Sequence, residues 1–345
     1  MDFSIASILL LDGVTNGAVY ALLAMAIVLL FAVTRVIFIP QGEFVAFGAL
    51  TVGMFQAGQL PGTIWLLLAM AVVVAVLDTF EQLRAGLGAA PIVRHLLRIL
   101  ALPLIVCAVS WWIAPSKPPL LVSALLTMLL VTPMGPLVYR LAYRSLADAS
   151  VLVLLIVSVG VHFALTGLGL LFFGAEGFRT PPFWDARFAV GPLMFSGQTL
   201  ITFFASAALI VLLWLFFERT LYGKALRATA VNRLGARLMG ISTTAAGALS
   251  FTMAAFIGAL SGLLIGPTTT VFYDSGFLIG LKGFVAAVFA GLASYPAAAI
   301  GALGVGILES FASFWASAFK EVIVFTAILP VLLWRSLRDH HADEE

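Results

Sequence analysis

The chain has 345 residues, of which 62% are hydrophobic and 10% are charged, whereas a soluble domain is about 45–50% apolar and about 25% charged. This composition excludes an ordinary soluble protein and indicates an integral membrane protein. The net charge of +2 is too small to suggest a nucleic-acid partner, and a single cysteine, Cys107, excludes a disulfide within the chain.

Apolar segments recur along the whole chain, and a helix needs about 20 such residues to cross a bilayer. We predict spans near 10–33, 40–58, 62–78, 99–113, 119–139, 150–174, 199–217, 245–266, 281–313 and 321–334. The short alternating segments of a membrane barrel are absent. We therefore expect an all-α polytopic transmembrane helix bundle, with about 8–10 spans in a single domain over 1–345.

The segment 281–313 is long enough for two helices. Pro296 removes a backbone donor and disfavours helix at Tyr295, so a break would fall at Ser294-Tyr295-Pro296. A broken or re-entrant pair of short segments is the alternative to one long span.

Lysine and arginine favour cytoplasmic loops and so predict orientation. Placing Arg35, the loops 79–98, 140–148 and 218–244, and the C-terminal tail on one side gathers 13 of the 18 basic residues there. The other side keeps Lys117, Arg179, Arg187, Lys282 and Lys320. The first side is expected to be cytoplasm, with the N-terminus outside and the C-terminus inside.

Small residues at four-residue spacing line two helix faces. One stripe is Ala254, Gly258, Gly262 and Gly266, and the other is Gly13, Gly17 and Ala21. Such faces let helix backbones approach closely in membranes. We expect them to pack helices within this bundle, and a subunit interface is the alternative.

Several polar residues fall at membrane depth, where they are costly and often functional. Asn16 and Tyr20, one turn apart, together with Gln41 and Glu43, are candidates to border a translocation path. Glu43 also follows Pro40 in a first helical turn, where the helix dipole stabilises a carboxylate, and this structural role suffices alone. His162, in span 150–174, is interpreted as an interhelical hydrogen-bonding partner, and Glu309 is noted as a further intramembrane polar residue.

The chain lacks the motifs of common enzymes. No phosphate-binding GxxxxGK[ST], HExxH or GxSxG motif occurs, and no clustered cysteines and histidines suggest a metal site. From these motifs we do not expect an enzyme, and we expect no cofactor or metal on this chain. If nucleotide energy drives transport, another subunit must bind the nucleotide.

Residues 222–241, YGKALRATAVNRLGARLMGI, form the long polar and basic stretch of the chain. Asn232 can cap a short helix that Gly240 is suited to end. Within it, Arg233 and Arg237 share one face, while Leu234, Leu238 and Ile241 share another. This pattern fits a socket on a partner protein and a helix lying on anionic lipid equally well.

Several segments resemble the permease subunits of branched-chain amino acid ABC importers. They are DGVTNGAVYALLAMAIVLLFAVTRVIFIPQGEFVAFGAL at 12–50, YRLAYRSL at 139–146, GKALRATAVNRLGARLMGI at 223–241, GLKGFVAAVFAGLASYPAAAIGALGVGILES at 280–310 and KEVIVFTAILPVLLWR at 320–335. The order and spacing of these segments carry the resemblance. Residues 78–118 look inserted relative to that family and are expected to add a helical pair.

The resemblance implies a permease of the bacterial inner membrane that imports a small solute delivered by a periplasmic binding protein. The solute would be a branched-chain or other amino acid, or a related amide or organic acid. The implied partners are a second homologous permease, in a heterodimer or else a homodimer, and two cytoplasmic ATPase subunits that bind ATP and Mg. An ion-coupled secondary transporter and a membrane scaffold without a path remain as alternatives.

The resemblance also makes the loop 218–244 the cytoplasmic coupling loop that contacts the ATPase. The coupling residues expected there are Arg227, Asn232, Arg233, Leu234, Arg237, Leu238, Met239 and Gly240. Two positions depart from the family pattern: Gln41 stands where a histidine is usual, and Asn232 stands where an acidic residue is usual. Neither change removes the structural role of its position.

Overall fold

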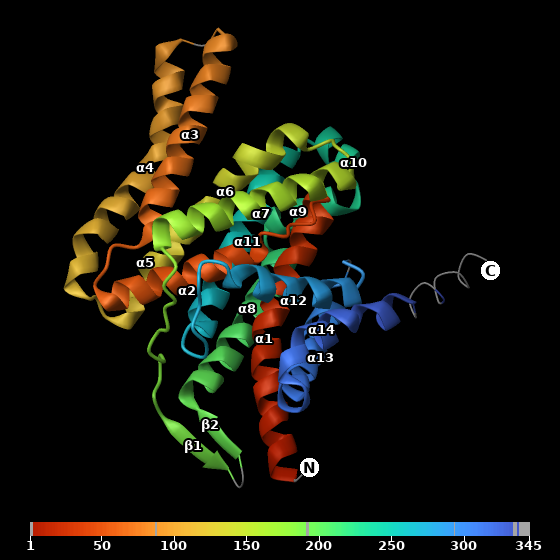
Figure 1. Ribbon diagram of the computed structural model, residues 1–345. Helices are drawn as coiled ribbons and strands as arrows, with labels where there is room; N and C mark the ends of the chain where they lie inside the picture. The colour runs from red at the N-terminus through yellow and green to blue at the C-terminus, as the bar shows by residue number, and fades with distance from the viewer. Residues whose placement is uncertain (1–2, 87, 191–192, 293, 334–336, 338–345) are drawn as a thin grey trace.

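The computed structural model describes residues 3–86, 88–190, 193–292, 294–333 and 337 (Figure 1). Its α-helices are α1 (Phe3–Thr34), α2 (Gln41–Ala57), α3 (Gly62–Arg84), α4 (Ala89–Ile113), α5 (Leu120–Val131), α6 (Met134–Val138), α7 (Val151–Phe173), α8 (Gly197–Arg219), α9 (Leu221–Val231), α10 (Arg233–Leu238), α11 (Thr243–Ile265), α12 (Ser275–Phe289), α13 (Tyr295–Trp315) and α14 (Lys320–Thr326). Eight helical segments of the described chain are long and apolar enough to cross a membrane. The all-α membrane bundle is confirmed.

Two central helices organise the bundle. Figure 1 shows α1 running through its middle from the N-terminal end, and α1 packs against α13, α11, α12 and α8. Helix α2 lies among α11, α12 and α5, and it is buried from Gln41 to Phe55. A helix that is apolar on all sides belongs in the interior of a bundle, so α2 contributes to the core rather than to the lipid-facing surface.

Hydroxyl side chains fix where several helices begin. Ser196, Ser242 and Ser294 cap α8, α11 and α13, each accepting a hydrogen bond from the backbone N–H three residues later. Such caps satisfy donors that the first helical turn leaves free. The helix starts at these points therefore follow from local sequence.

The segment predicted at 281–313 forms two helices, so the structure has the broken alternative rather than one long span. Helix α12 ends at Phe289 and α13 begins at Tyr295, with Pro296 in its first turn. The predicted start was late, because α12 begins at Ser275. Lys282 consequently lies within α12 rather than at the edge of a span, and it is buried.

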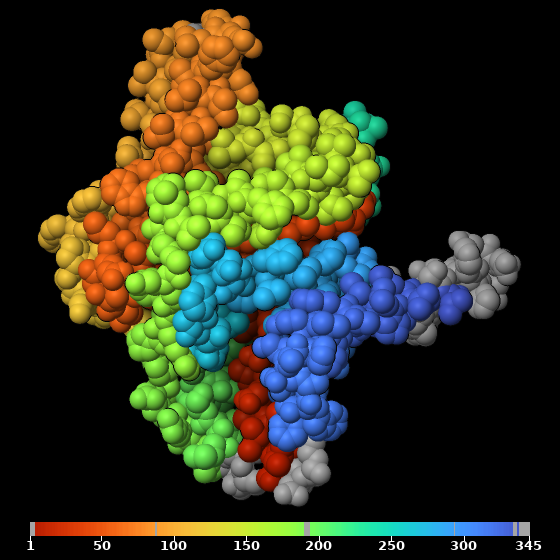
Figure 2. Space-filling model, in the orientation of Figure 1, coloured from red at the N-terminus to blue at the C-terminus, as the bar shows by residue number. Residues whose placement is uncertain are grey.

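The segment 78–118 also differs from the prediction. Residues 79–98 were predicted as a loop, but α3 continues to Arg84 and α4 starts at Ala89. Helices α3 and α4 form one hairpin that projects from the body (Figures 1 and 2). The segment therefore contains the last turns of α3 and the whole of α4.

Two smaller features were not predicted. The span 119–139 bends at Pro133 between α5 and α6 and continues as a π-helical turn over Tyr139–Tyr143. Strands β1 (Arg187–Val190) and β2 (Leu193–Ser196) pair antiparallel, with Arg187 opposite Ser196. This hairpin and the start of α1 lie at one end of the molecule, and α10 lies at the other (Figure 1).

Candidate functional site

A polar cavity of about 710 Å³ lies between α1, α12 and α13. Its walls carry hydroxyl, amide and charged side chains, and they include Leu9, Asp12, Thr15, Asn16, Tyr20, Ser196, Thr199, Thr268, Thr269, Thr270, Ser275, Lys282, Glu309, Ser310, Lys320 and Glu321. Because Leu9 and Ser196 are among them, the cavity lies in the half of the bundle near the β-hairpin. Its volume is in the range of small-molecule sites.

Three helices bring opposite charges together in this cavity. The Nζ of Lys282 on α12 lies 2.6 Å from Oε1 of Glu309 on α13 and 3.2 Å from Oε1 of Glu321 on α14. The Lys282 side chain is 7% exposed. A charge at this depth is costly unless it is paired, so the cluster holds three separate helices in one arrangement around the cavity.

Helix α1 joins the same cluster through Tyr20. The Tyr20 hydroxyl donates a 2.6 Å hydrogen bond to Oε2 of Glu309, and the Lys282 Nζ lies 5.8 Å from the centre of the Tyr20 ring. Both oxygens of Glu309 are thereby engaged. Asn16, one turn earlier on α1, lines the cavity as well, so the structure brings these two predicted path residues together.

Gln41 and Glu43 do not line this cavity. Both are fully buried in α2, where the Gln41 Nε2 donates a 2.9 Å hydrogen bond to the carbonyl oxygen of Ala254. Oε1 of Glu43 lies 2.8 Å from Nδ1 of His162 on α7. His162 thus has the interhelical partner that was predicted for it. The four predicted path residues form two pairs in different places.

The residues that sequence reasoning missed are Lys282 and Glu321. Lys282 was counted only as a basic residue of the outer side, at the start of the segment predicted at 281–313, and Glu321 stands only at the start of the last apolar segment. A signal was present, since a lysine and a glutamate of opposite charge, Lys282 and Glu309, occur in neighbouring apolar segments. Intramembrane charges are expected to pair with one another.

A second candidate site is the short surface helix α10. The Oδ1 of Asn232 accepts a 2.8 Å hydrogen bond from the Gly235 N–H, which is the predicted cap. Gly240 has φ of +80° and follows the helix, and the Ile241 N–H reaches back to the Ala236 carbonyl. This is the geometry with which glycine ends a helix, so both predicted ends are present.

The two faces of α10 point in different directions. Arg233 donates a 2.7 Å hydrogen bond to the Ala147 carbonyl, and Arg237 contacts Thr243 at 3.0 Å and Asp148 at 3.2 Å. Leu234, Leu238 and Met239 are 68%, 81% and 82% exposed. The arginines therefore hold the helix against the body, and the apolar side chains face outward, away from the bundle.

Arg227, the remaining predicted coupling residue, lies on α9. Its Nη1 donates a 2.5 Å hydrogen bond to Oε1 of Glu218 at the end of α8. This contact joins α9 to a span of the bundle. Arg227 thus supports the helix preceding α10 and stands apart from the exposed apolar side chains of α10.

Comparison with known proteins gives the family. A family model described as the permease component of branched-chain amino acid transport systems matches residues 9–333. The chain belongs to this permease family. It is a multi-pass membrane protein and a transport subunit.

Three curated relatives of this permease show the extent of the similarity. The high-affinity branched-chain amino acid transport system permease protein BraD of Pseudomonas aeruginosa is 31% identical over 228 residues, which cover 64% of this chain and 74% of BraD. LivH of Escherichia coli K12 is 32% identical over 205 residues, 56% of this chain and 65% of LivH. LivH of Salmonella typhimurium is 27% identical over 336 residues, 93% of this chain and 91% of that protein. No solved structure matches the chain.

The small-residue stripes of this permease lie at helix contacts within the chain. A Cβ added at Gly262 would meet the Val45 carbonyl oxygen at 2.2 Å, and one at Gly258 would meet the Phe44 Cβ at 2.6 Å, so α11 and α2 touch along their backbones. Ala254 accepts the Gln41 bond, and Gly266 faces Thr180. On α1, Gly13 and Gly17 lie against Ile307 and Leu303 of α13.

Proposed function

We propose that this permease is the transmembrane subunit of an ATP-binding cassette importer and that the polar cavity forms part of its path for a small solute. The solute class is a branched-chain or other amino acid, or a related amide or organic acid. The observation that carries the proposal is the cluster of buried Lys282 and Glu309 with half-buried Glu321 in a cavity of about 710 Å³. Intramembrane ionisable residues mark substrate pathways in many membrane proteins.

Opposite charges in one cavity suit a solute that carries both signs. The Lys282 ammonium and the Glu309 and Glu321 carboxylates lie among the hydroxyls of Thr15, Ser310 and other residues. The charged groups of a zwitterion could take the place of partners in these ion pairs. The new pairs would offset part of the free-energy cost of removing the solute from water. The relatives named for branched-chain amino acid transport support this solute class.

Helix α10 is the proposed contact with a cytoplasmic ATPase. Leu234, Leu238 and Met239 would enter an apolar groove of that partner, as an amphipathic helix enters a groove. Closure of two ATPases, which bind ATP and Mg, would then shift the permease between outward-facing and inward-facing states. A second homologous permease and a periplasmic binding protein would complete the assembly, as a heterodimer of permeases or else a homodimer.

The proposed orientation puts α10 in the cytoplasm of a bacterium and the β-hairpin outside. It follows from the basic residues: Arg35, Arg140, Arg144, Arg233 and Arg237 belong to the segments assigned to the inner side. The N-terminus would then lie outside the inner membrane and the C-terminus in the cytoplasm. Under this orientation the polar cavity faces the side from which a binding protein would deliver solute.

The experiment is uptake of radiolabelled leucine, isoleucine and valine by proteoliposomes. The permease is reconstituted with its gene-neighbour ATPases, second permease and binding protein, and compared with the permease alone. Uptake that requires ATP, the ATPases and the binding protein is expected. Uptake by the permease alone, driven by an imposed proton or sodium gradient, would overturn the proposal in favour of an ion-coupled secondary transporter.

A further inference from the structure

The α3–α4 hairpin carries a groove that the transport cavity does not explain. The groove consists of two adjoining hollows of about 340 and 320 Å³, which share His95 and Arg98. The larger is mainly apolar and is lined by Val74, Asp78, His95, Arg98, Ile99, Leu102, Pro103, Pro133, Pro136, Leu137 and Arg140. The smaller is more polar than the larger and is lined by Gln82, Pro91, Arg94, His95 and Arg98.

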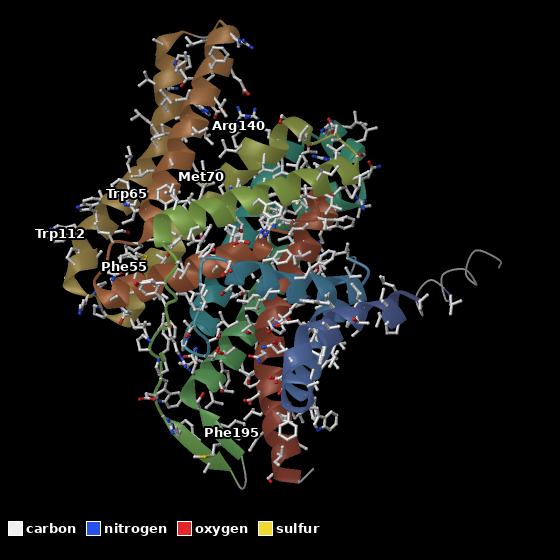
Figure 3. All side chains as sticks on the ribbon, viewed as in Figure 1. Phe55, Trp65, Met70, Trp112, Arg140 and Phe195 are labelled. Atoms are coloured by element: carbon white, nitrogen blue, oxygen red, sulfur yellow. The ribbon has the colours of Figure 1, made fainter. Side chains whose placement is uncertain are left out.

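The carboxylates beside this groove are already engaged. Arg140 donates 2.5 Å hydrogen bonds to Oδ1 of Asp78 and to Oε2 of Glu81. The Nε2 of His95 lies 2.9 Å from Oδ2 of Asp78. Figure 3 shows Arg140 in the body beside the base of the projecting hairpin.

Two arginines of α4 carry the positive charge at the groove that no ion pair neutralises among the described residues. Arg94 and Arg98 are exposed, and within the described part of the chain no acidic side chain forms an ion pair with either. Four residues apart, they share one face of the helix. An anionic group at the polar end of the groove would therefore meet two guanidinium groups, while the Asp78 carboxylate of the adjoining hollow is engaged by His95 and Arg140.

Tryptophans mark the level of this groove in the bilayer. Trp111 packs edge-on against Trp65 at 5.4 Å, and Trp112 is 83% exposed (Figure 3). Tryptophan is enriched at membrane interfaces. Arg94 precedes Trp112 by 18 positions in one helix, or about 27 Å at 1.5 Å per residue, close to the roughly 30 Å hydrocarbon thickness. Arg94 thus lies at the membrane interface opposite to the tryptophans. The Arg98 side chain reaches the same interface by extending along the helix.

We propose that this groove is a binding site for an anionic phospholipid. The phosphate lies against Arg94 and Arg98, and an acyl chain lies against Leu102, Pro103 and Leu137. Guanidinium groups bind phosphate oxygens in paired, charge-assisted hydrogen bonds, and basic pockets between membrane helices bind lipid headgroups in this way. In the proposed orientation the site faces the cytoplasmic leaflet.

The position of the site gives the lipid a structural role. Arg140, which lines the groove, lies in the π-helical turn, and the chain continues from there to Ala147 and Asp148, the partners of Arg233 and Arg237. A bound lipid would fix the hairpin against the segment that holds α10. The lipid binding itself requires neither a transported solute nor an ATPase.

The test is native mass spectrometry of the purified full chain in detergent. Dioleoyl-phosphatidylglycerol is compared with dioleoyl-phosphatidylcholine, which has the same acyl chains and no net charge. The variant is Arg94→Ala with Arg98→Ala, and the matched control is Arg187→Ala with Arg219→Ala, which removes the same charge from exposed arginines elsewhere. We expect the natural chain and the control to retain phosphatidylglycerol preferentially, and the variant to lose on the order of tenfold or more of that retention.

A second variant tests the apolar half without changing charge. Leu102→Trp narrows the groove at an exposed position and should lower phosphatidylglycerol retention several-fold. Equal retention of the two lipids by the natural chain, or full retention of phosphatidylglycerol by the Arg94/Arg98 variant, would overturn the proposal. Because no transport is measured, these outcomes are independent of those for the uptake experiment.

Discussion

The polar cavity and helix α10 place the same kinds of side chain in opposite environments. In the cavity, Lys282 and Glu309 are buried and each neutralises the other, whereas on α10 the arginines are half exposed and leave Leu234 and Leu238 uncovered. Removing a partner in the cavity leaves an uncompensated charge in a membrane interior. Removing a charged partner on the surface of α10 leaves the remaining charge solvated by water. The first region should therefore determine stability, and the second should determine association.

The largest expected effect comes from Lys282→Met. It leaves Glu309 buried without a cation and leaves Glu321 with only Lys320 nearby, and breaking a buried pair from one side typically costs about 3–5 kcal/mol. The free energy of unfolding in mixed micelles, measured by denaturant titration, should fall by that amount, and leucine uptake by the reconstituted assembly should be lost.

Two controls isolate the buried charge. Lys282→Arg keeps the cation and should retain most of the stability. Lys320→Met removes a lysine that is 40% exposed and 3.9 Å from Glu321, and should cost less than about 1 kcal/mol. If all three variants unfolded alike, the cluster would not be a source of stability and the contrast with α10 would fail.

The next largest effect is expected on association with the ATPase rather than on stability. Leu234→Glu with Leu238→Glu changes exposed side chains, so the free energy of unfolding should stay within about 0.5 kcal/mol of the natural value. If these leucines fill an ATPase groove, charges there should reduce ATPase co-purification and ATP-dependent uptake at least tenfold, since losing a buried apolar contact typically costs more than about 1.4 kcal/mol. Leu337→Glu, at an exposed position outside the coupling loop 218–244, is the control and should leave both unchanged.

Sequence reasoning predicted these two regions unequally for a physical reason. The ends of α10 depend on Asn232 and Gly240, whose preferences are local, and the structure contains both. The break before α13 is likewise encoded by Ser294 and Pro296. The cavity depends on Tyr20, Lys282, Glu309 and Glu321, which are far apart in the chain and meet only through tertiary packing. No local pattern specifies such a meeting.

The errors of prediction have the same origin. Residues 79–98 are rich in charge and were predicted as a loop, yet Asp78, Glu81 and Arg140 neutralise one another across helices. Long-range pairing thus allowed α3 to continue to Arg84. Gln41 and Glu43 remain predicted path residues that do not line the polar cavity, and the groups they contact, on Ala254 and His162, are likewise distant in sequence.

A smaller effect is expected from Asn232→Ala, which removes the α10 cap. Loss of an N-cap costs about 1 kcal/mol, and in a helix this short the loss should appear as local fraying rather than global unfolding. Hydrogen exchange of residues 233–240 should accelerate about fivefold, while exchange in α11 stays unchanged. Asn232→Asp, whose carboxylate can cap equally well, should keep the natural protection. Fast exchange in both variants would mean that the side-chain cap does not order α10.

The smallest effect should come from Arg237→Ala. Its pair with Asp148 spans 3.2 Å, and both side chains are largely solvent-accessible, so the pair contributes about 0.2–1 kcal/mol and less at high salt. Arg237 also donates a hydrogen bond to Thr243 and so helps to orient the leucine face of α10. ATP-dependent uptake should therefore fall a few-fold, a larger effect than that on the free energy of unfolding. Raising the ionic strength should reduce uptake by the natural chain toward that of the variant.

Asp148→Ala breaks the ion pair but leaves the Thr243 bond, and should have the smaller effect on uptake. Equal losses in the two variants would show that the ion pair alone positions α10, and unchanged uptake in both would assign that positioning to Arg233 and its bond to Ala147.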